Sequence, residues 1–227
     1  MQLSQLIYEV GEVGFNSPRR QSDIKDLINR AQREIAQRRN WTFMHLRTTA
    51  QVGAGTTSAD LGPNFKCLSS EKSPVSFTQG SYNLPVAVAS REEIEGLGIW
   101  PWADGPAFTP TPGSMAPVRV VFLEKNGPTG NWTLNIPPQL TPTLPLVFNL
   151  SAFFFPADLV LGTDSTQMTN HGDLADAIIN LAKYRLYAAE EPGSKESAAC
   201  KQMYEDGIKR ACYADEQQKW GGRTMRM

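Results

Sequence analysis

Long apolar runs are absent from this sequence of 227 residues. The longest, such as residues 152–155, are far too short to cross a bilayer, so we predict no membrane-spanning helix and no membrane partner. The N-terminal stretch also lacks the pattern of a signal peptide. It contains Glu9 and Glu12, and no basic segment precedes an apolar one.

Cysteine is scarce, with only Cys67, Cys200 and Cys212 in the chain. Cys200 and Cys212 would lie about 18 Å apart along one helix, which is too far for a disulfide. Cys67 has no partner in the sequence. Three free thiols are typical of a protein made in a reducing cytoplasm.

A strong charge of either sign is missing too, because the net charge is −1. Residues 1–47 carry a net +3, residues 48–170 carry −4, and residues 171–227 are neutral. None of these segments is basic enough to predict tight nucleic-acid binding by charge alone.

The signatures of catalysis and metal binding are also missing. His45 and His171 are far apart and have no cysteine or carboxylate at metal-ligand spacing. The sequence has no G-x-S-x-G nucleophile elbow, and 53–55 (Gly-Ala-Gly) lacks the rest of a dinucleotide or phosphate loop. We therefore predict no enzyme activity, no metal and no cofactor.

One carboxylate cluster is an exception that needs weighing. Glu92, Glu93 and Glu95 form a group of acids of the kind that glycosidases use in pairs. The same residues also fit a solvated helical turn, and we favour that interpretation.

What the sequence does contain is a strong amphipathic pattern from Ser22 to Arg39. Apolar side chains recur at the spacing of one helical face: Ile24, Leu27, Ile28, Ala31 and Ile35. Ser22 is a candidate N-cap, and the helix would be about 25 Å long. Trp41 and Phe43 alternate directly after it, which favours a strand leaving the helix.

Three further helices are predicted near the termini. Residues 3–13 have Leu3, Leu6, Ile7 and Val10 on one face. A helix after His171-Gly172, with Asp173 as a possible cap, is apolar around most of its circumference. After the break at Pro192-Gly193, Ser194 or Ser197 starts a last helix whose inward residues would be Cys200, Met203, Tyr204, Ile208 and Ala211.

The middle of the chain differs in kind, because fourteen of the sixteen prolines fall between residues 48 and 170. That density forbids long helices and favours short strands. The expected strands are 43–52, 65–68, 81–84, 87–89, 118–123, 132–136 and 146–155. Residues 97–117, around Trp100 and Trp102, are expected to form a long ordered loop.

These patterns predict an α+β protein. We expect residues 1–47 and 171–217 to form an α-helical bundle from the N- and C-terminal helices. Residues 48–170 would be a proline-rich β-sheet insertion, and 218–227 an extended C-terminal tail. A helix cannot bury its apolar stripe alone, so the first helices must find the last ones.

The order of these features resembles the head-to-tail adaptor (connector) proteins of tailed bacteriophages. The first long helix of that family typically reads N-x-A-x-x-E-I-A-x-x-x-x-W-x-F. Here the matching residues are Asn29, Ala31, Glu34, Ile35, Ala36, Trp41 and Phe43, and a Tyr-x-Leu-Pro follows at Tyr82, Leu84 and Pro85.

The resemblance implies a virion structural protein at the head–tail interface, made in the host cytoplasm. It implies a dodecamer ring that docks under the portal protein, contacts a tail or nozzle protein, and passes DNA through its lumen without reading sequence. The β insertion would face the tail side. The resemblance also implies that the C-terminal tail runs into the portal.

Two sets of residues are candidates for these contacts. The tail combines basic and large apolar side chains, as interface anchors do, and its portal-binding candidates are Lys219, Trp220, Arg223, Met225, Arg226 and Met227. The all-round apolar helix near residue 180 suggests a buried subunit interface between copies, formed by Leu174, Ile178, Ile179, Leu181 and Leu186.

Two other functions stay open at this point. A glycan- or cell-wall-binding module, or a glycosidase, could use Trp100, Trp102 and Trp132 as stacking platforms. A DNA-binding helical protein could use the arginines of the long helix (Arg30, Arg33, Arg38 and Arg39) to contact phosphates, although acids on the same helix favour a solvated flank.

Overall fold

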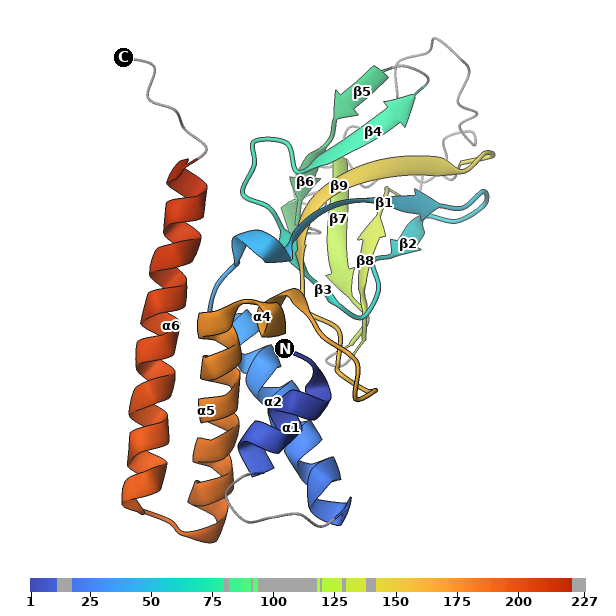
Figure 1. Cartoon of the computed structure of the whole chain (residues 1–227). Coiled ribbons are helices and arrows are strands. Elements are labelled where there is room, and N and C mark those ends of the chain that lie inside the picture. Colours follow the sequence, from blue (N-terminus) through green and yellow to red (C-terminus); the bar gives the residue numbers. More distant parts are fainter. Residues whose placement is uncertain are drawn as a thin grey trace, which may run out of the picture. The chain divides into compact units, whose positions relative to one another are not determined.

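The computed structural model describes residues 1–11, 18–79, 82–90, 92–93, 118, 120–127, 130–137 and 142–221. The chain is a mixed α+β protein, as the sequence predicts (Figure 1). It divides into two compact units. We call residues 1–44 with 155–227 the helical unit, and residues 45–154 the β unit. In the described residues no helix combines the length and hydropathy that crossing a membrane requires.

The helical unit contains helices from both ends of the chain. They are α1 (Leu3–Gly11), α2 (Pro18–Arg38), the short 3₁₀ turn η1 (Thr42–Met44), α4 (Gln167–Asn170), α5 (Gly172–Glu190) and α6 (Lys195–Gly221). α5 packs against α1, α2, α4 and α6. α6 lies close to α5 at Gly207, where an added Cβ would be in van der Waals contact, at 3.4 Å, with the Cβ of Ala177 and the carbonyl oxygen of Asp173.

Several helix boundaries differ from the prediction. α2 begins at Pro18, so Ser22 lies inside the helix and is not its cap. Proline suits this place because the first helical turn needs no N–H donor. Ser194 caps α6, accepting a hydrogen bond from the Ser197 N–H at 3.1 Å, as expected. α6 then continues to Gly221, so Lys219 and Trp220 are helical and not part of an extended tail.

The inward face of α6 was predicted correctly except at one position. Tyr204, Ile208 and Ala211 are buried, whereas Met203 is 58% exposed. Met203 precedes Tyr204 by one residue, which is about 100° around the helix, so it points away from the stripe that packs on α5.

The β unit consists of two sheets. The first contains β1 (His45–Val52), β9 (Leu146–Phe154), β4 (Val75–Gln79) and β5 (Tyr82–Pro85), with β3 (Phe65–Leu68) pairing to the end of β9. The second has the order β2 (Ser58–Asp60), β8 (Trp132–Asn135), β7 (Val120–Lys125), β6 (Ala87–Ala89). β7 and β8 form the predicted antiparallel pair, with Phe122 opposite Asn135. Only β6 pairs in parallel among the described strands.

Both sheets contribute to one apolar core. Val52, Phe77 and Phe148 come from the first sheet, and Val121 and Leu134 from the second. The strands β2 and β4 were not predicted; β2 has three residues, Ser-Ala-Asp, and β4 has only two large apolar side chains, Val75 and Phe77. Trp41 and Phe43 were expected to begin a strand, but η1 covers Thr42–Met44 and β1 starts at His45.

The division of the chain differs from the predicted insertion at 48–170. Residues 155–170 group with the helices and not with the strands. The physical reason is a set of hydrogen bonds between this segment and α2, described below. The expected loop at 97–117, including Trp100 and Trp102, lies outside the described residues.

Candidate interaction surfaces

The residues of α2 and of the turn after it that resemble the adaptor pattern have structural roles. Trp41 is fully buried and its indole N–H donates to the Ile35 carbonyl at 3.1 Å, so the chain folds back against the end of α2. Phe43 stacks on Trp41, with ring centroids 6.0 Å apart. Ala31, Ile35 and Ala36 are buried in the same core. These side chains hold the turn that leaves the helix.

Asn29, another residue of the adaptor pattern, holds the segment after β9 against α2. Its amide donates to the Leu159 carbonyl at 3.0 Å, and its carbonyl oxygen accepts from the Leu159 N–H at 2.9 Å. One helical turn further, the buried Gln32 donates to the Ala157 carbonyl and accepts from the Thr166 hydroxyl. Arg33 adds a two-pronged ion pair with Asp158. We call residues 155–166 the anchored loop.

The tip of the anchored loop presents two apolar side chains to solvent. Val160 is 63% and Leu161 64% exposed. The Asp164 carboxylate accepts hydrogen bonds from both of their backbone N–H groups, at 2.8 and 2.7 Å. The Leu161 and Val160 amides hold the pKa of Asp164 below its usual value. Hydrogen bonds hold the anchored loop in place, and its exposed aliphatic side chains are free to contact another protein. A loop that is already ordered loses little conformational entropy when it binds.

The remaining pattern residue, Glu34, joins α2 to the C-terminal helices. Its carboxylate pairs with Arg185 of α5 and, at 3.7 Å, with Arg38. Arg38 also lies 3.8 Å from Glu205 and over the ring of Tyr204. Burial raises the pKa of Tyr204 to about 12, and among the described residues its hydroxyl has no hydrogen-bond partner.

The C-terminal end of α6 is fixed by a buried carboxylate. Asp215 is 4% exposed; it accepts from the Thr42 N–H at 2.7 Å and lies 3.1 Å from Arg39. Lys219 approaches the same carboxylate at 3.4 Å. Of the predicted portal-binding residues, Lys219 therefore has a structural ion pair, and Trp220 lies in the last turn of α6. Arg223, Met225, Arg226 and Met227 lie outside the described residues.

The predicted subunit-interface stripe is covered within one chain. Leu174, Ile178, Ile179 and Leu181 are all buried, and Leu186 is half-buried. The apolar character of α5 is explained by its contacts with α1, α2, α4 and α6, so it needs no second copy. That burial removes the reason for expecting a subunit contact at those four residues; the existence of a contact between copies stays a prediction.

Of the four arginines considered for phosphate contact, three are paired with acids, and Arg30 is exposed on α2. Arg33 pairs with Asp158, Arg38 with Glu34 and Glu205, and Arg39 with Asp215 and Glu216. Their charges are balanced by acids of the same unit, which favours the solvated-flank interpretation over phosphate binding.

In the β unit, His45, Ser151 and Glu71 lie together but lack the geometry of a catalytic relay. His45 Nε2 is 2.6 Å from the Ser151 hydroxyl, and Glu71 approaches the same nitrogen at 3.8 Å. In a triad, the carboxylate orients the other ring nitrogen. Ser151 is also buried and accepts from Ser69 at 3.0 Å. Within the described ranges no group of histidine, cysteine and acidic residues could hold a metal ion.

The other carboxylate and aromatic candidates are structural where they are described. Glu93 and Ser90 exchange two hydrogen bonds that cap a helical turn, as the solvated-turn interpretation predicts. Trp132 is half-buried and meets Phe65 edge to face at 6.2 Å, so it offers no open stacking platform. Glu95 lies outside the described residues.

Comparison with known proteins gives one clear result. The sequence model of the SU10 adaptor protein family matches the chain over residues 1–227, its whole length. No curated protein matches the sequence.

Proposed function

The chain belongs to the SU10 adaptor protein family, and we propose that it forms the ring that docks under the portal and joins the capsid to the tail. Membership makes it a structural adaptor of the phage virion, a class that is typically non-enzymatic. The family match over the whole chain is the observation that carries the proposal.

The proposed partners are the portal protein on one side and a tail or nozzle protein on the other. A ring of twelve copies would leave a channel through which DNA passes without sequence recognition. We further propose that the helices from the two ends of the chain form the bundle of the ring wall. The contacts of α2 with α5, and of η1 with α6, support a single helical body.

For the portal contact we propose the end of α6 and the residues that follow it: Lys219, Trp220, Arg223, Met225, Arg226 and Met227. Asp215 supports this proposal, because its bond to Thr42 fixes the end of α6 against η1. The residues that follow α6 would therefore leave the helical unit at a fixed position. Basic and large apolar side chains are those that anchor interfaces.

For the contact between copies we propose the tip of the anchored loop, Val160 and Leu161. Their exposure and the hydrogen bonds that hold the loop favour this place over the buried stripe of α5. Heterologous contacts of this kind can close into rings. Of the five predicted α5 interface residues, only Leu186 is half-buried and retains appreciable surface for such a contact.

The experiment combines the purified chain with the portal protein of the same phage and images the mixture by electron microscopy. We expect a closed ring of adaptor density on the portal. A V160S/L161S variant should remain folded but give isolated copies or incomplete rings, whereas M203S, which removes an equally exposed apolar side chain from α6, should still form rings. Absence of any adaptor density on the portal would overturn the proposed function.

A further inference from the structure

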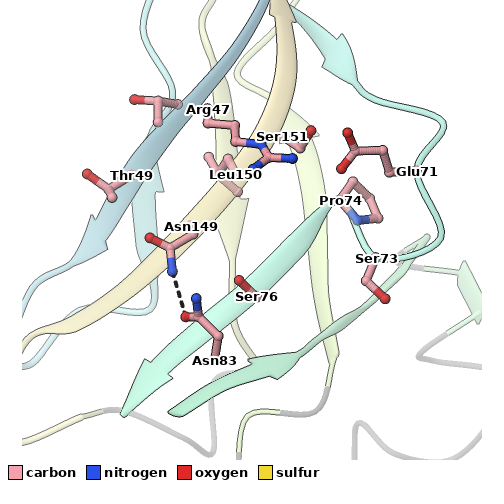
Figure 2. A pocket seen from close by; sticks show the side chains of 11 residues that line it. Arg47, Thr49, Glu71, Ser73, Pro74, Ser76, Asn83, Asn149, Leu150 and Ser151 are labelled. Atoms are coloured by element: carbon pink, nitrogen blue, oxygen red, sulfur yellow. Dashed lines mark hydrogen bonds between the residues drawn. The ribbon is translucent and has the colours of Figure 1, made fainter. Parts of the chain in front are cut away.

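The outer face of the first sheet holds a polar groove of about 430 Å³ (Figure 2). Arg47 and Thr49 come from β1, Asn149 from β9, Ser76 from β4 and Asn83 from β5, and Glu71 borders the groove from the segment between β3 and β4. The strand register puts these residues side by side: Thr49 is opposite Asn149, which is opposite Ser76. The groove belongs entirely to the β unit.

Two asparagines that line the groove are hydrogen-bonded to each other and to Thr78. The Asn83 carbonyl oxygen accepts from the Asn149 amide at 3.0 Å and from the Thr78 hydroxyl at 2.8 Å. The Asn149 amide also donates to Thr78. Among the described residues, this leaves the Asn83 amide N–H groups and the Asn149 carbonyl oxygen without a partner. A donor and an acceptor are therefore presented together.

The surrounding groups are mostly uncharged. The hydroxyls of Thr49 and Ser76 can each donate and accept. Arg47 has no ion pair among the described residues, and Glu71, at the same groove, supplies the opposite charge. An anion would meet Glu71 and an apolar ligand would leave these polar groups unpaired, so both are disfavoured. The groove suits a neutral ligand rich in both donors and acceptors.

Beyond the residues that line the groove, an aromatic pair lies two residues from Arg47 and Ser151 along β1 and β9. His45 and Phe153 are opposite each other in the register, and their rings are 5.3 Å apart. Both residues are half-buried. Sugar rings combine hydroxyls, which need donors and acceptors, with C–H faces, which pack on aromatic rings.

We propose that this groove binds a neutral saccharide, with Asn83, Asn149 and Arg47 contacting its hydroxyls. Its size falls within the range of small-ligand sites. The proposal is independent of the adaptor function. It also differs in place from a glycan site built on Trp100, Trp102 and Trp132.

The test is NMR titration of the full chain, following the side-chain amide signals of Asn83 and Asn149. The probes are glucose, galactose, mannose, N-acetylglucosamine and their disaccharides, with inorganic phosphate as the anionic comparison. At least one sugar should shift both signals saturably. N83A and R47A should weaken that binding by about tenfold or more, as expected for lost hydrogen bonds to a bound ligand; for N83A the response is followed at Asn149.

The matched control is N131A, which removes an asparagine that bonds Asp60 elsewhere in the β unit. It should bind like the unmodified chain, and thermal unfolding of all three variants shows whether each is folded. The proposal would be overturned by the absence of a saturable shift with any sugar, by N83A and R47A binding as tightly as the unmodified chain, or by a stronger response to phosphate than to sugars.

Discussion

The side-chain amide of Asn29 forms a pair of hydrogen bonds with the backbone N–H and C=O of Leu159, 130 residues further along the chain. Leu159 is buried, so neither backbone group could be satisfied by water if the amide were removed. Together with Gln32 and Arg33, Asn29 places the anchored loop on α2. The same bonds explain why residues 155–166 belong to the helical unit.

Replacing Asn29 should therefore destabilise the helical unit. We expect N29A to lower the free energy of unfolding by about 2 kcal/mol, because two buried backbone groups lose their partners. The control is N180A, whose amide only bonds the Asp176 carbonyl of its own helix and which should cost no more than about 0.5 kcal/mol. Urea unfolding measures both. Equal values for the two variants would contradict this role of Asn29.

The anchored loop should loosen in acid. The pKa of Asp164 is below its usual value because its carboxylate accepts from the Leu161 and Val160 amides. Such a group contributes stability that is complete above its unfolded pKa of 3.8 and is lost as the pH falls through its folded value. Protection of the Val160 and Leu161 amides from hydrogen exchange, corrected for intrinsic rates, should fall over that range. D164N should show the low protection already at neutral pH.

The Tyr204 hydroxyl should be dispensable. It is buried with no hydrogen-bond partner among the described residues, so Y204F should leave the free energy of unfolding unchanged or raise it by about 1 kcal/mol. Burial raises the pKa of Tyr204 from 10.0 to about 12, so the unfolded chain loses this proton first as the pH rises. Between pH 10 and about 12, the free energy of unfolding of the unmodified chain should therefore fall relative to that of Y204F. Parallel alkaline unfolding curves for the two proteins would show that folding does not raise the pKa of this hydroxyl and would contradict its burial.

Asp215 should matter more than its neighbour Glu216, although both lie near Arg39. D215N keeps an acceptor for the Thr42 N–H but removes the charge that faces Arg39 and Lys219. Breaking this buried pair should cost about 3 kcal/mol. E216Q removes a largely exposed partner of Arg39 and should cost less than about 1 kcal/mol. Thermal unfolding measures the stability lost in each variant. A larger loss in E216Q than in D215N would contradict this role of Asp215.

The sequence predicts the helices and most strands well, because their apolar periodicity reflects which face is buried. It also identifies the family through residues that prove to be structural, such as Trp41 and Asn29. What it misses depends on long-range contacts. Nothing local to 155–166 shows that this segment is fastened to α2, although Gln32, a polar residue within an apolar stripe, is a signal of a buried hydrogen bond.

The expectation of a subunit interface on α5 arose from the same limit. An apolar helix predicts burial, but the pattern of α5 alone cannot distinguish a neighbour in the same chain from a neighbour in another copy. The polar groove combines β1, the neighbouring strands β4 and β5, and β9, which are far apart in sequence, so no single motif indicates it.

The most direct test of the adaptor proposal compares portal binding by the full chain and by a chain that ends at Gly221. This truncation removes residues 222–227 and keeps α6 with its Asp215 contacts, so both proteins should unfold at the same temperature. We expect the full chain to co-sediment with purified portal rings and the truncated chain to lose that binding. Equal binding by the two chains would contradict the proposed portal contact, and failure of the full chain to bind would contradict the adaptor function itself.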